Sequence, residues 1–258
     1  MKLAIAGAGG RMGRTLIDAV LADRELSLAV ALDVPGSPAL GKELGGGVKV
    51  GSDLRALATA EVLIDFTRPE GTLEHLEACV THAKPIVIGT TGFSEIQKKS
   101  ILEASRRIPV VMSPNFAVGV NVLFRLAQTA AGALGKDYDV EIVEAHHRHK
   151  VDAPSGTALK LGEIVAKALR RDLERVATHG RKGDTGERPA AQIGFHAIRG
   201  GDIVGEHTVI FAGTGERVEL AARSQSRMTY AAGALRAAKW LKDRPAGLYD
   251  MFHVLGLS

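Results

Sequence analysis

The residues best suited to chemistry are three histidines, an arginine and a lysine that occupy positions 146–150. Imidazole titrates near physiological pH, so His146 is a candidate for giving a proton to a substrate. His147 and Lys150 carry or can acquire positive charge, and we expect them to hold a substrate carboxylate. His149 is expected to pack or to lie exposed without a role. The cluster therefore predicts a site for an anionic small molecule at which a proton is transferred.

A helix start follows this cluster along the chain. Pro154-Ser155-Gly156-Thr157 leads into residues 158–169, whose apolar side chains recur at helical spacing. Ser155 suits an N-cap, and the N–H groups of Gly156 and Thr157 at the beginning of a helix favour a carboxylate. Ser155 is expected to cap this helix whether or not it also contacts a ligand. The helix start therefore predicts a second binding element beside the cations.

Near the beginning of the chain, Gly7, Gly10 and Gly13 come directly after a predicted strand and open a predicted helix. Glycines at such a turn let the backbone approach a pyrophosphate, whose charge the helix N-terminus favours. Asp33 ends the next predicted strand, where its carboxylate can accept hydrogen bonds from an adenosine ribose. An ordinary turn beside a surface aspartate is the alternative. The order of strand, glycine turn and helix favours a dinucleotide.

Two further loops follow predicted strands, at the ends where open α/β sheets bind ligands. They are Gly89-Thr90-Thr91-Gly92 and Ser113-Pro114-Asn115-Phe116. Their small polar groups could contact the ribose or amide of a nicotinamide, although turn chemistry and helix capping explain such residues equally well. Asp33 would repel a 2′-phosphate and Val34 adds no cation beside it, so NADH is expected to be at least well used.

A metal ion and a nucleic acid are the other ligands that a basic, histidine-rich segment could bind. His146, His147 and His149 could be metal ligands, but no cysteine, histidine or carboxylate stands at a matching spacing. Successive side chains of a strand would also point to opposite faces. Aromatic residues make up only 4% of the chain, which leaves few platforms for stacking bases. We therefore expect neither a metal ion nor a nucleic acid.

The composition is that of a globular protein with one or two domains, since 45% of the 258 residues are hydrophobic and 24% are charged. The net charge of +4 is mildly basic and suits anionic small molecules. Cys79 is the single cysteine, so no intramolecular disulfide can form and a reducing cytoplasm is expected. No apolar run approaches the length of a membrane span, so no membrane partner is expected.

Alternation of apolar runs and helix-like segments marks the first half of the chain. Strands are predicted at residues 3–6, 26–32, 62–66, 85–88 and 109–112, and helices at 10–22, from about Pro69, and at 94–106. Fully apolar strands separated by helices are typical of a parallel sheet covered on both faces. The first half is therefore expected to form a doubly wound sheet.

The pattern changes after Asn115. The charged, glycine-containing residues 170–188 are expected to form an excursion or a loop. The other predicted elements are helix 118–134, strand 139–145, helix 158–169, strands 192–199, 203–212 and 217–222, and helix 227–240. The last three strands are joined by short glycine-rich turns without helices between them, which predicts an antiparallel or mixed sheet.

Taken together, these residues resemble the dihydrodipicolinate reductase family, the NAD(P)H-dependent enzymes of bacterial lysine and diaminopimelate synthesis. The resemblance covers essentially the full length; residues 144–157 are its most specific part, and the glycine loop is generic. The matching segments are residues 7–13, 65–72, 89–92, 115–121, 144–157, 200–207 and 226–229. The resemblance implies an α/β chain with a Rossmann-type, doubly wound parallel sheet in a dinucleotide-binding domain over residues 1–117 and 227–258. It also implies a second α+β domain with a mixed sheet over residues 118–226, which binds substrate and builds a homotetramer.

The resemblance also implies roles for individual residues in a hydride transfer from NADH or NADPH to a cyclic imine dicarboxylate. The proton donor or acceptor falls on His146, and a proton donor falls on Lys150. Substrate contacts fall on His147, Ser155, Gly156 and Thr157. Cofactor contacts fall on Gly7, Ala8, Gly9, Gly10, Arg11, Met12, Asp33, Gly89, Thr90, Thr91, Ser113, Pro114, Asn115 and Phe116. Many bacterial members have Glu-Arg where this chain has Asp33-Val34, which argues against a preference for NADPH.

Two other functions are compatible with the same pattern. One is a nicotinamide-dependent reductase of another small carboxylic acid, and the other is a dinucleotide-binding sensor without turnover. His146 and Lys150 argue against the sensor, because a sensor has no need of a proton donor. Assay with the dihydrodipicolinate precursor distinguishes all three.

Overall fold

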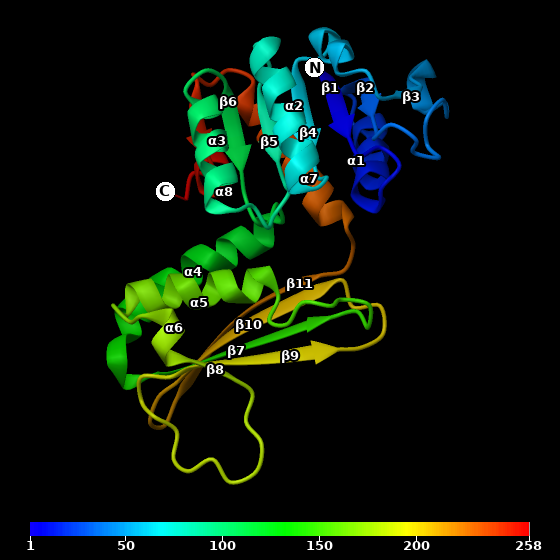
Figure 1. Ribbon diagram of the computed structural model, residues 1–258. Coiled ribbons are helices and arrows are strands. Elements are labelled where there is room, and N and C mark those ends of the chain that lie inside the picture. The colour runs from blue at the N-terminus through cyan, green and yellow to red at the C-terminus, as the bar shows by residue number, and fades with distance from the viewer. Residues whose placement is uncertain (258) are drawn as a thin grey trace. The chain divides into compact units, whose positions relative to one another are not determined.

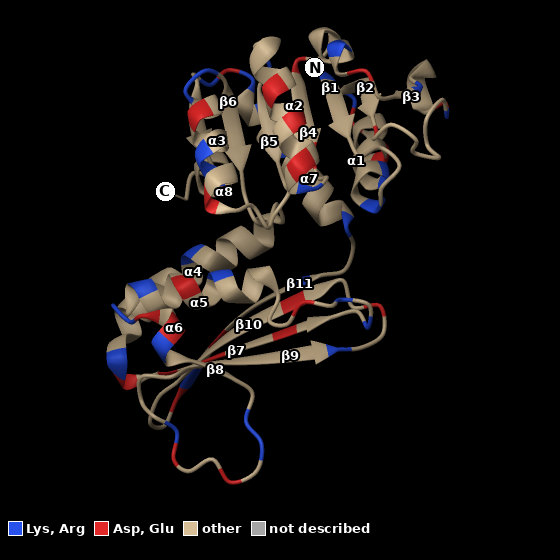
Figure 2. Cartoon of the chain, viewed as in Figure 1, with Lys and Arg blue, Asp and Glu red and all other residues tan. Residues whose placement is uncertain are grey.

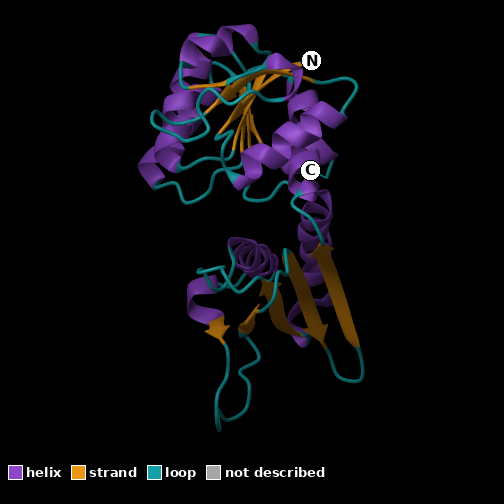
Figure 3. Ribbon diagram, turned by 90° about the vertical axis from the view of Figure 1, so that its right-hand side faces the viewer, coloured by secondary structure: helices purple, strands orange, loops and turns teal. Residues whose placement is uncertain are grey.

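A computed structural model describes residues 1–257, which divide into two units (Figure 1). Unit 1 consists of residues 1–118 and 227–257, and unit 2 consists of residues 119–226. Each unit is built around a sheet of its own (Figure 3). Lysine and arginine are scattered among aspartate and glutamate in both units (Figure 2). None of the described helices is long and apolar enough to cross a membrane.

Within the described residues, unit 1 holds a seven-stranded sheet with the order β12-β6-β5-β4-β1-β2-β3, in which every pairing is parallel. Its strands are β1 (Lys2–Ala6), β2 (Ser27–Leu32), β3 (Val50–Gly51), β4 (Val62–Asp65), β5 (Ile86–Ile88), β6 (Pro109–Met112) and β12 (Gly247–Tyr249). The five strands predicted for the first half are all present. β3 and β12 are not predicted from the sequence, because two or three residues carry too little periodicity.

Helices cover both faces of this sheet. They are α1 (Arg11–Ala22), α2 (Pro69–Thr81), α3 (Glu95–Ser105), α7 (Met228–Leu241) and α8 (Met251–Leu255), with short 3₁₀ turns at Gly45–Gly47 and Leu54–Thr59. Leu3 and Ile5 of β1 pack in one core with residues of α1 and α7, whereas Ala4 and Ala6 belong to the core with α2 and α3. The prediction of a doubly wound parallel sheet is confirmed.

Unit 2 holds a five-stranded sheet with the order β11-β10-β7-β9-β8. Its elements are α4 (Val118–Leu134), a 3₁₀ turn at Gly135–Asp137, β7 (Asp139–His146), α5 (Gly156–Ala168), α6 (Leu173–Val176), β8 (Ala177–His179), β9 (Ile193–Arg199), β10 (Gly205–Ala212) and β11 (Arg217–Ser224). β9 is parallel to β7 and β8, whereas β10 is antiparallel to β7 and β11. The predicted mixed sheet is confirmed.

The expectation that residues 170–188 form only a loop is wrong, because α6 and β8 lie within them. Asp172 caps α6 by accepting a hydrogen bond from Glu174 N, and β8 adds to the edge of the sheet beside β9. Arg181 and Arg188 further along bind Glu141 of β7. Pairing and ion contacts that only the folded chain supplies therefore order part of a segment whose composition is that of a loop.

Alternation along β7 decides which of its side chains enter the core of unit 2. Val140, Ile142, Glu144 and His146 are buried, and between them Glu141 and Val143 are only partly buried. Helix α5 packs against β7, β9 and β10. A side chain at Gly162 of α5 would collide with Phe195 of β9, so this glycine permits the close approach. The polar pair Glu144 and His146 therefore lies on the apolar face of the strand, at its end.

Candidate active site

Pairing in unit 1 brings the predicted cofactor residues to one edge of its sheet. Ala6 at the end of β1 lies opposite Leu32 on one side and Asp65 on the other, and Asp65 lies opposite Ile88. Ile88 lies opposite Met112. The glycine loop, Asp33, Gly89 and Ser113 therefore follow strand ends that are aligned along the carboxyl edge, where open parallel sheets bind their ligands.

The glycine loop is closed tightly on itself. Gly7 has a φ of +70°, and Gly10 donates a hydrogen bond to Gly7 O at 2.9 Å. A Cβ atom at Gly13 would lie 2.0 Å from Gly7 O, and one at Gly9 would lie 2.6 Å from Asp33 Oδ2. Glycine is thus required at position 13 for the loop to fold back against the first turn of α1, and at position 9 for the close approach of Asp33.

The beginning of α1 suits an anion. Gly10 is the N-cap and supplies no side-chain hydrogen bond, and the first turn carries no acidic residue. The first N–H groups of a helix have no partner within the helix and, with the helix dipole, attract negative charge. The residues present therefore fit a pyrophosphate.

Asp33 follows β2 and faces the glycine loop. Its Oδ2 accepts a hydrogen bond from Gly9 N at 2.8 Å and its Oδ1 accepts one from Val34 N at 2.8 Å. A carboxylate oxygen can accept more than one hydrogen bond, so both oxygens keep capacity for ribose hydroxyls. Val34 is 64% exposed and offers no positive charge.

The loop after β5 turns its hydroxyl inward rather than toward a ligand. Thr90 is 4% exposed, and its Oγ1 donates to Asp65 Oδ1 while accepting from Thr72 Oγ1. A Cβ atom at Gly89 would meet the Phe66 ring, so this turn packs tightly. Thr91 is exposed. Contacts from Gly89 and Thr90 to a cofactor would therefore come from the backbone.

Asp65 is the buried anchor of this edge. It has no exposed surface, and Thr67 N, Thr67 Oγ1 and Thr90 Oγ1 donate to its Oδ1. His75 Nδ1 of α2 lies 2.6 Å from its Oδ2. Burial alone would raise the pKa of Asp65, but the hydrogen bonds from His75 and Thr67 outweigh it and hold the pKa below its usual value. Asp65 therefore remains an anion that ties α2 to two loops.

The loop after β6 is likewise bonded internally. Ser113 Oγ donates to Asn115 O at 2.9 Å, and Asn115 Oδ1 accepts from Ala117 N at 2.8 Å. The Phe116 ring packs on Phe66 with centroids 5.4 Å apart. Pro114 is exposed. The turn chemistry that the sequence analysis left open is present, and it fixes the backbone next to the carboxyl edge.

In unit 2, the register of the sheet brings four ionisable residues to one place. His207 of β10 lies directly opposite Glu144 of β7, and Arg199 of β9 lies opposite His146. Glu144 Oε2 lies 2.5 Å from His146 Nδ1, and both oxygens of Glu144 accept from Arg199 at 2.8 Å. Glu144 Oε1 also accepts from Ser155 N at 3.0 Å.

The protonation of these residues follows from their surroundings. Burial raises the pKa of Glu144, but hydrogen bonds from Arg199 and His146 outweigh it and hold that pKa below its ordinary value. Burial lowers the pKa of His146, and the bond to Glu144 offsets this only in part. Burial also lowers the pKa of His207 to about 4. His207 is therefore neutral at physiological pH, whereas His146 keeps a carboxylate that favours its protonated form.

The other residues of the cluster lie in the loop after β7. Lys150 Nζ pairs with Asp152 Oδ1 at 2.8 Å, and its positive charge helps to lower the pKa of His146. His147 is partly buried and its ring lies 6.2 Å from that of His149. His149 is exposed.

Helix α5 begins where the sequence predicts. Ser155 caps it by accepting a hydrogen bond from Ala158 N at 3.2 Å, and Ser155 Oγ also lies 3.0 Å from His207 Nε2. Gly156 and Thr157 form the first turn, which carries no acidic residue. Ser155 is 2% exposed, so its hydroxyl serves the protein's own structure first. The N-terminus of α5 remains suited to a carboxylate.

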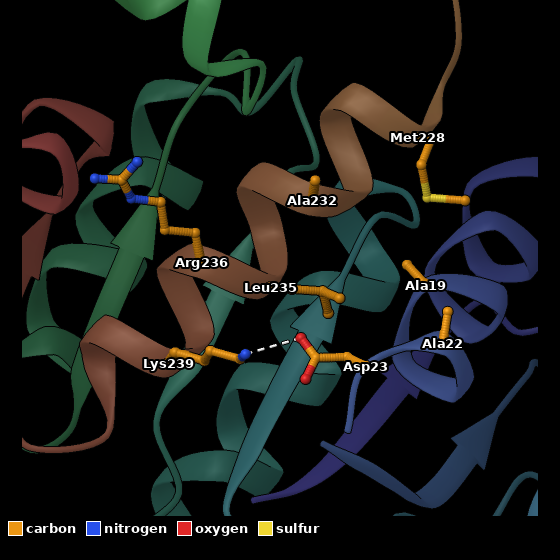
Figure 4. Close-up of a pocket in the computed structure, with 8 residues that line it drawn as sticks. All are labelled: Ala19, Ala22, Asp23, Met228, Ala232, Leu235, Arg236 and Lys239. Carbon is orange, nitrogen blue, oxygen red and sulfur yellow. Dashed lines mark hydrogen bonds and ion pairs between the residues drawn. The ribbon is translucent and has the colours of Figure 1, made fainter. Parts of the chain in front are cut away.

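A hollow of about 650 Å³ lies between α1 and α7 beside the Asp23–Lys239 ion pair, and it contains none of the predicted site residues (Figure 4). Among the described residues, no group of three or more histidine, cysteine, aspartate or glutamate side chains is placed to hold a metal ion.

The sequence did not predict the buried hydrogen-bonding partners that position the candidate site residues. Glu144 is one of them, and Arg199 and His207 reach it from strands 55 and 63 residues further along the chain. A signal for Glu144 exists, because it occurs at the period-two positions that Val140 and Ile142 mark as buried. Asp65 and His75 were missed as well, since nothing in their spacing indicates the contact.

Comparisons with known proteins cover both units. A family profile described as dihydrodipicolinate reductase, N-terminus, matches residues 1–116, and one described as dihydrodipicolinate reductase, C-terminus, matches residues 119–255. The chain is 57% identical over 265 residues to the 4-hydroxy-tetrahydrodipicolinate reductase of Cupriavidus necator, with 100% of each chain covered. It is 57% identical over 263 residues to the same enzyme of Dechloromonas aromatica, covering 99% of this chain and 98% of the relative.

A solved structure agrees with these matches. The dipicolinate-bound dihydrodipicolinate reductase from Paenisporosarcina sp. TG-14 superposes with a TM-score of 0.80 at 26% identity, over 98% of both chains. The family profiles, the relatives and the fold point the same way, and the chain belongs to the dihydrodipicolinate reductase family.

Proposed function

We propose that this chain reduces 4-hydroxy-tetrahydrodipicolinate to tetrahydrodipicolinate with hydride from a reduced nicotinamide nucleotide, in lysine and diaminopimelate synthesis. Relatives with 57% identity over their full length carry the name of this activity. The observation that carries the proposal is the cluster at the end of β7, where a buried His146 is held by Glu144 beside the N-terminus of α5. In the reaction a hydride and a proton enter the substrate and its hydroxyl leaves as water.

The substrate carries two carboxylates, and unit 2 offers groups for both. The first turn of α5 at Gly156 and Thr157 would bind one carboxylate through N–H groups and the helix dipole. His147 and Lys150 would bind the other. A dianion that leaves water needs such partners, because an unpaired buried charge costs many kcal/mol. Ser155 would act by fixing the helix start through its cap.

Proton transfer falls to His146 and Lys150. Glu144 accepts only, so neutral His146 carries its proton on Nδ1 and presents Nε2 as a proton acceptor. Protonated His146 donates from Nε2 instead, and the Lys150 ammonium is a further donor. Either group can supply the proton that hydride addition to the ring requires.

The cofactor set lies along the carboxyl edge of unit 1. The glycine loop with Arg11 and Met12 would hold the pyrophosphate, and Asp33 would hold the adenosine ribose. The turns at 89–91 and 113–116 would hold the nicotinamide half. When bound there, a reduced nicotinamide nucleotide supplies the hydride. Because Asp33 repels a 2′-phosphate and Val34 is apolar, we propose that NADH is well used.

We further propose that unit 1 is the dinucleotide-binding unit and unit 2 the substrate-binding and oligomerisation unit of a cytoplasmic homotetramer. The family resemblance supports the tetramer. The single buried Cys79 suits a reducing compartment. Sedimentation velocity tests the tetramer, and a monomer at micromolar concentration would contradict it.

Steady-state oxidation of NADH and NADPH tests the activity. Turnover is expected with 4-hydroxy-tetrahydrodipicolinate, and dipicolinate is expected to inhibit competitively against it. Turnover with another small unsaturated acid and none with this substrate would favour a different reductase. Binding of NADH without turnover of any substrate would favour a sensor.

A further inference from the structure

Glu144 occupies an unusual place in unit 2. The side chain is 1% exposed, and donors reach it from its own strand, from the end of β9 and from the residue that precedes α5. A buried carboxylate is costly unless it is paired and its oxygens are satisfied. Packing alone would be served as well by an apolar residue, as at Val140 and Ile142 on the same face. The ionised group therefore calls for an explanation beyond stability.

We propose that Glu144 is the positioning residue of the site: it fixes the tautomer and orientation of His146 and links that imidazole to the start of α5. The inference rests on the proposed function, because it assigns the machinery that His146 needs in that reaction. Glu144 does not touch the substrate in this proposal. It acts through His146 and Ser155.

Glu144 fixes the tautomer of His146. His146 Nδ1 lies 2.5 Å from Glu144 Oε2, and an ionised carboxylate can only accept a hydrogen bond. Nδ1 therefore carries hydrogen in both the neutral and the protonated ring. Nε2 is then the nitrogen that gains and loses the proton. Without the carboxylate, the neutral ring could place its hydrogen on either nitrogen.

Glu144 also fixes the orientation of the His146 ring. Arg199 donates to both oxygens of Glu144 at 2.8 Å, a two-point contact that fixes the plane of the carboxylate. Arg199 Nη2 also donates to Asp152 O at 2.6 Å, which ties the pair to the loop before α5. One oxygen of Glu144 then holds His146 and the other holds Ser155 N. Proton transfer and carboxylate binding therefore share one rigid reference point.

Glu144 also supplies negative charge beside His146. Lys150 and Arg199 face His146 with positive charges, and His207 contacts it edge to face as a neutral ring. Asp152 is engaged by Lys150. The first turn of α5 adds no acidic group. Glu144 is thus the anion that bonds to the imidazole among the described residues, and its removal leaves burial and two cations to act against protonation.

The test compares Glu144→Gln with Glu144→Asp in the whole protein. In Glu144→Gln the limb of the kcat/KM pH profile that belongs to His146 is expected to move to lower pH, by about one unit or more. The direction is the same whether His146 acts as acid or as base, because in either role its own pKa falls. Glu144→Asp keeps the charge and is expected to return the limb toward the wild-type position. A Glu144→Gln limb at the wild-type position would overturn the proposal.

Glu141→Gln is the matched control. Glu141 belongs to the same strand and also pairs with arginines, Arg181 and Arg188, but its side chain alternates to the other face. Its loss is expected to leave the limb in place. A shift equal to that of Glu144→Gln would point to general disturbance of β7 and would overturn the specific role.

Ring ¹⁵N shifts of the wild-type protein give a second readout that needs no variant of Glu144 to fold and no turnover. The His146 signals, assigned by their loss in His146→Gln, are expected to show the Nδ1–H tautomer in the neutral ring. The Nε2–H tautomer would overturn the proposal. Absence of wild-type turnover would contradict the proposed function instead, so the two failures are distinguishable.

Discussion

His146 and His207 are both buried, and their rings meet edge to face at 5.1 Å, yet their surroundings give them different states. His146 bonds to a carboxylate, whereas His207 Nε2 faces the Ser155 hydroxyl. His207 Nδ1 has no hydrogen-bond partner among the described residues. A histidine with a carboxylate can hold a proton in a buried place, and one without it stays neutral. Of these two histidines, His146 is therefore the one equipped for proton transfer.

Replacement of His146 tests that assignment. His146→Gln is expected to lower kcat by roughly a hundredfold or more, the usual size of a lost general acid or base. His149 is an exposed histidine of the same segment, and His149→Gln is expected to keep wild-type kinetics. Steady-state kinetics of both variants give the answer, and an unchanged kcat in His146→Gln would remove it from the mechanism.

Val34 follows Asp33 directly and bears on the choice between NADH and NADPH. Val34→Arg would place a guanidinium beside Asp33, where it can pair with a 2′-phosphate. KM for NADPH is expected to fall on the order of tenfold, or about 1.4 kcal/mol, while KM for NADH changes little. Val34→Gln, of similar length without charge, is the control. An NADPH KM that stays the same in Val34→Arg would contradict the role of Asp33.

The packing of the glycine loop against helix α1 depends on the absence of a side chain at Gly13. A Cβ atom at Gly13 would lie 2.0 Å from a backbone oxygen that cannot move without opening the loop. Gly13→Ala is therefore expected to lower the thermal midpoint and to raise Kd for NADH, measured by fluorescence titration. Gly132→Ala in α4 meets nothing within 4 Å and is expected to be neutral or stabilising by up to about 1 kcal/mol. Similar behaviour of the two variants would contradict this account of the loop.

How far the sequence predicts the elements depends on their length and periodicity. Five of the parallel strands of unit 1 and the long helix α4 follow from apolar runs and are confirmed. β12 is different: its three residues, Gly247–Tyr249, pair with β6 only because the end of the chain returns to unit 1. β8 depends likewise on the edge that β9 presents. Tertiary pairing, which local pattern does not contain, decides such short strands.

Some residues of the candidate site could be predicted from the sequence and others could not. Histidine, lysine and the helix start attract attention by residue type, and the structure gathers His146 and Ser155 around Glu144. Arg199 lies beside His146 through the register between β7 and β9, and a shift of one residue would point its side chain to the other face. Registers are set by the whole sheet, so sequence spacing could not supply this partner. The roles carried over from the family stay predictions.

For the whole molecule, buried ionisable groups tie stability to pH. The pKa of His207 is about 4 in the folded protein against an ordinary value of 6.5, and burial is the main cause. Between these two values the unfolded chain binds more protons than the folded one, so stability falls as pH falls. This contribution is fully present above pH 6.5 and is lost toward pH 4. Its slope cannot exceed about 1.4 kcal/mol per pH unit for one proton.

Urea unfolding at pH 7 and pH 5 checks this expectation. The free energy of unfolding of the wild-type protein is expected to be lower at pH 5, and the difference is expected to shrink in His207→Gln, which has no ring to protonate. His146, whose pKa burial also lowers, contributes in the same direction and prevents the difference from vanishing. Equal pH dependence in the two proteins would contradict a neutral, buried His207.

The central claim is that the chain transfers hydride to the ring of 4-hydroxy-tetrahydrodipicolinate. Mass analysis of the product after turnover with NADH that carries deuterium at the transferable position of the nicotinamide measures this step directly. One deuterium per molecule of tetrahydrodipicolinate is expected, with one NADH oxidised for each product formed. No product, or a product free of deuterium, would contradict the account.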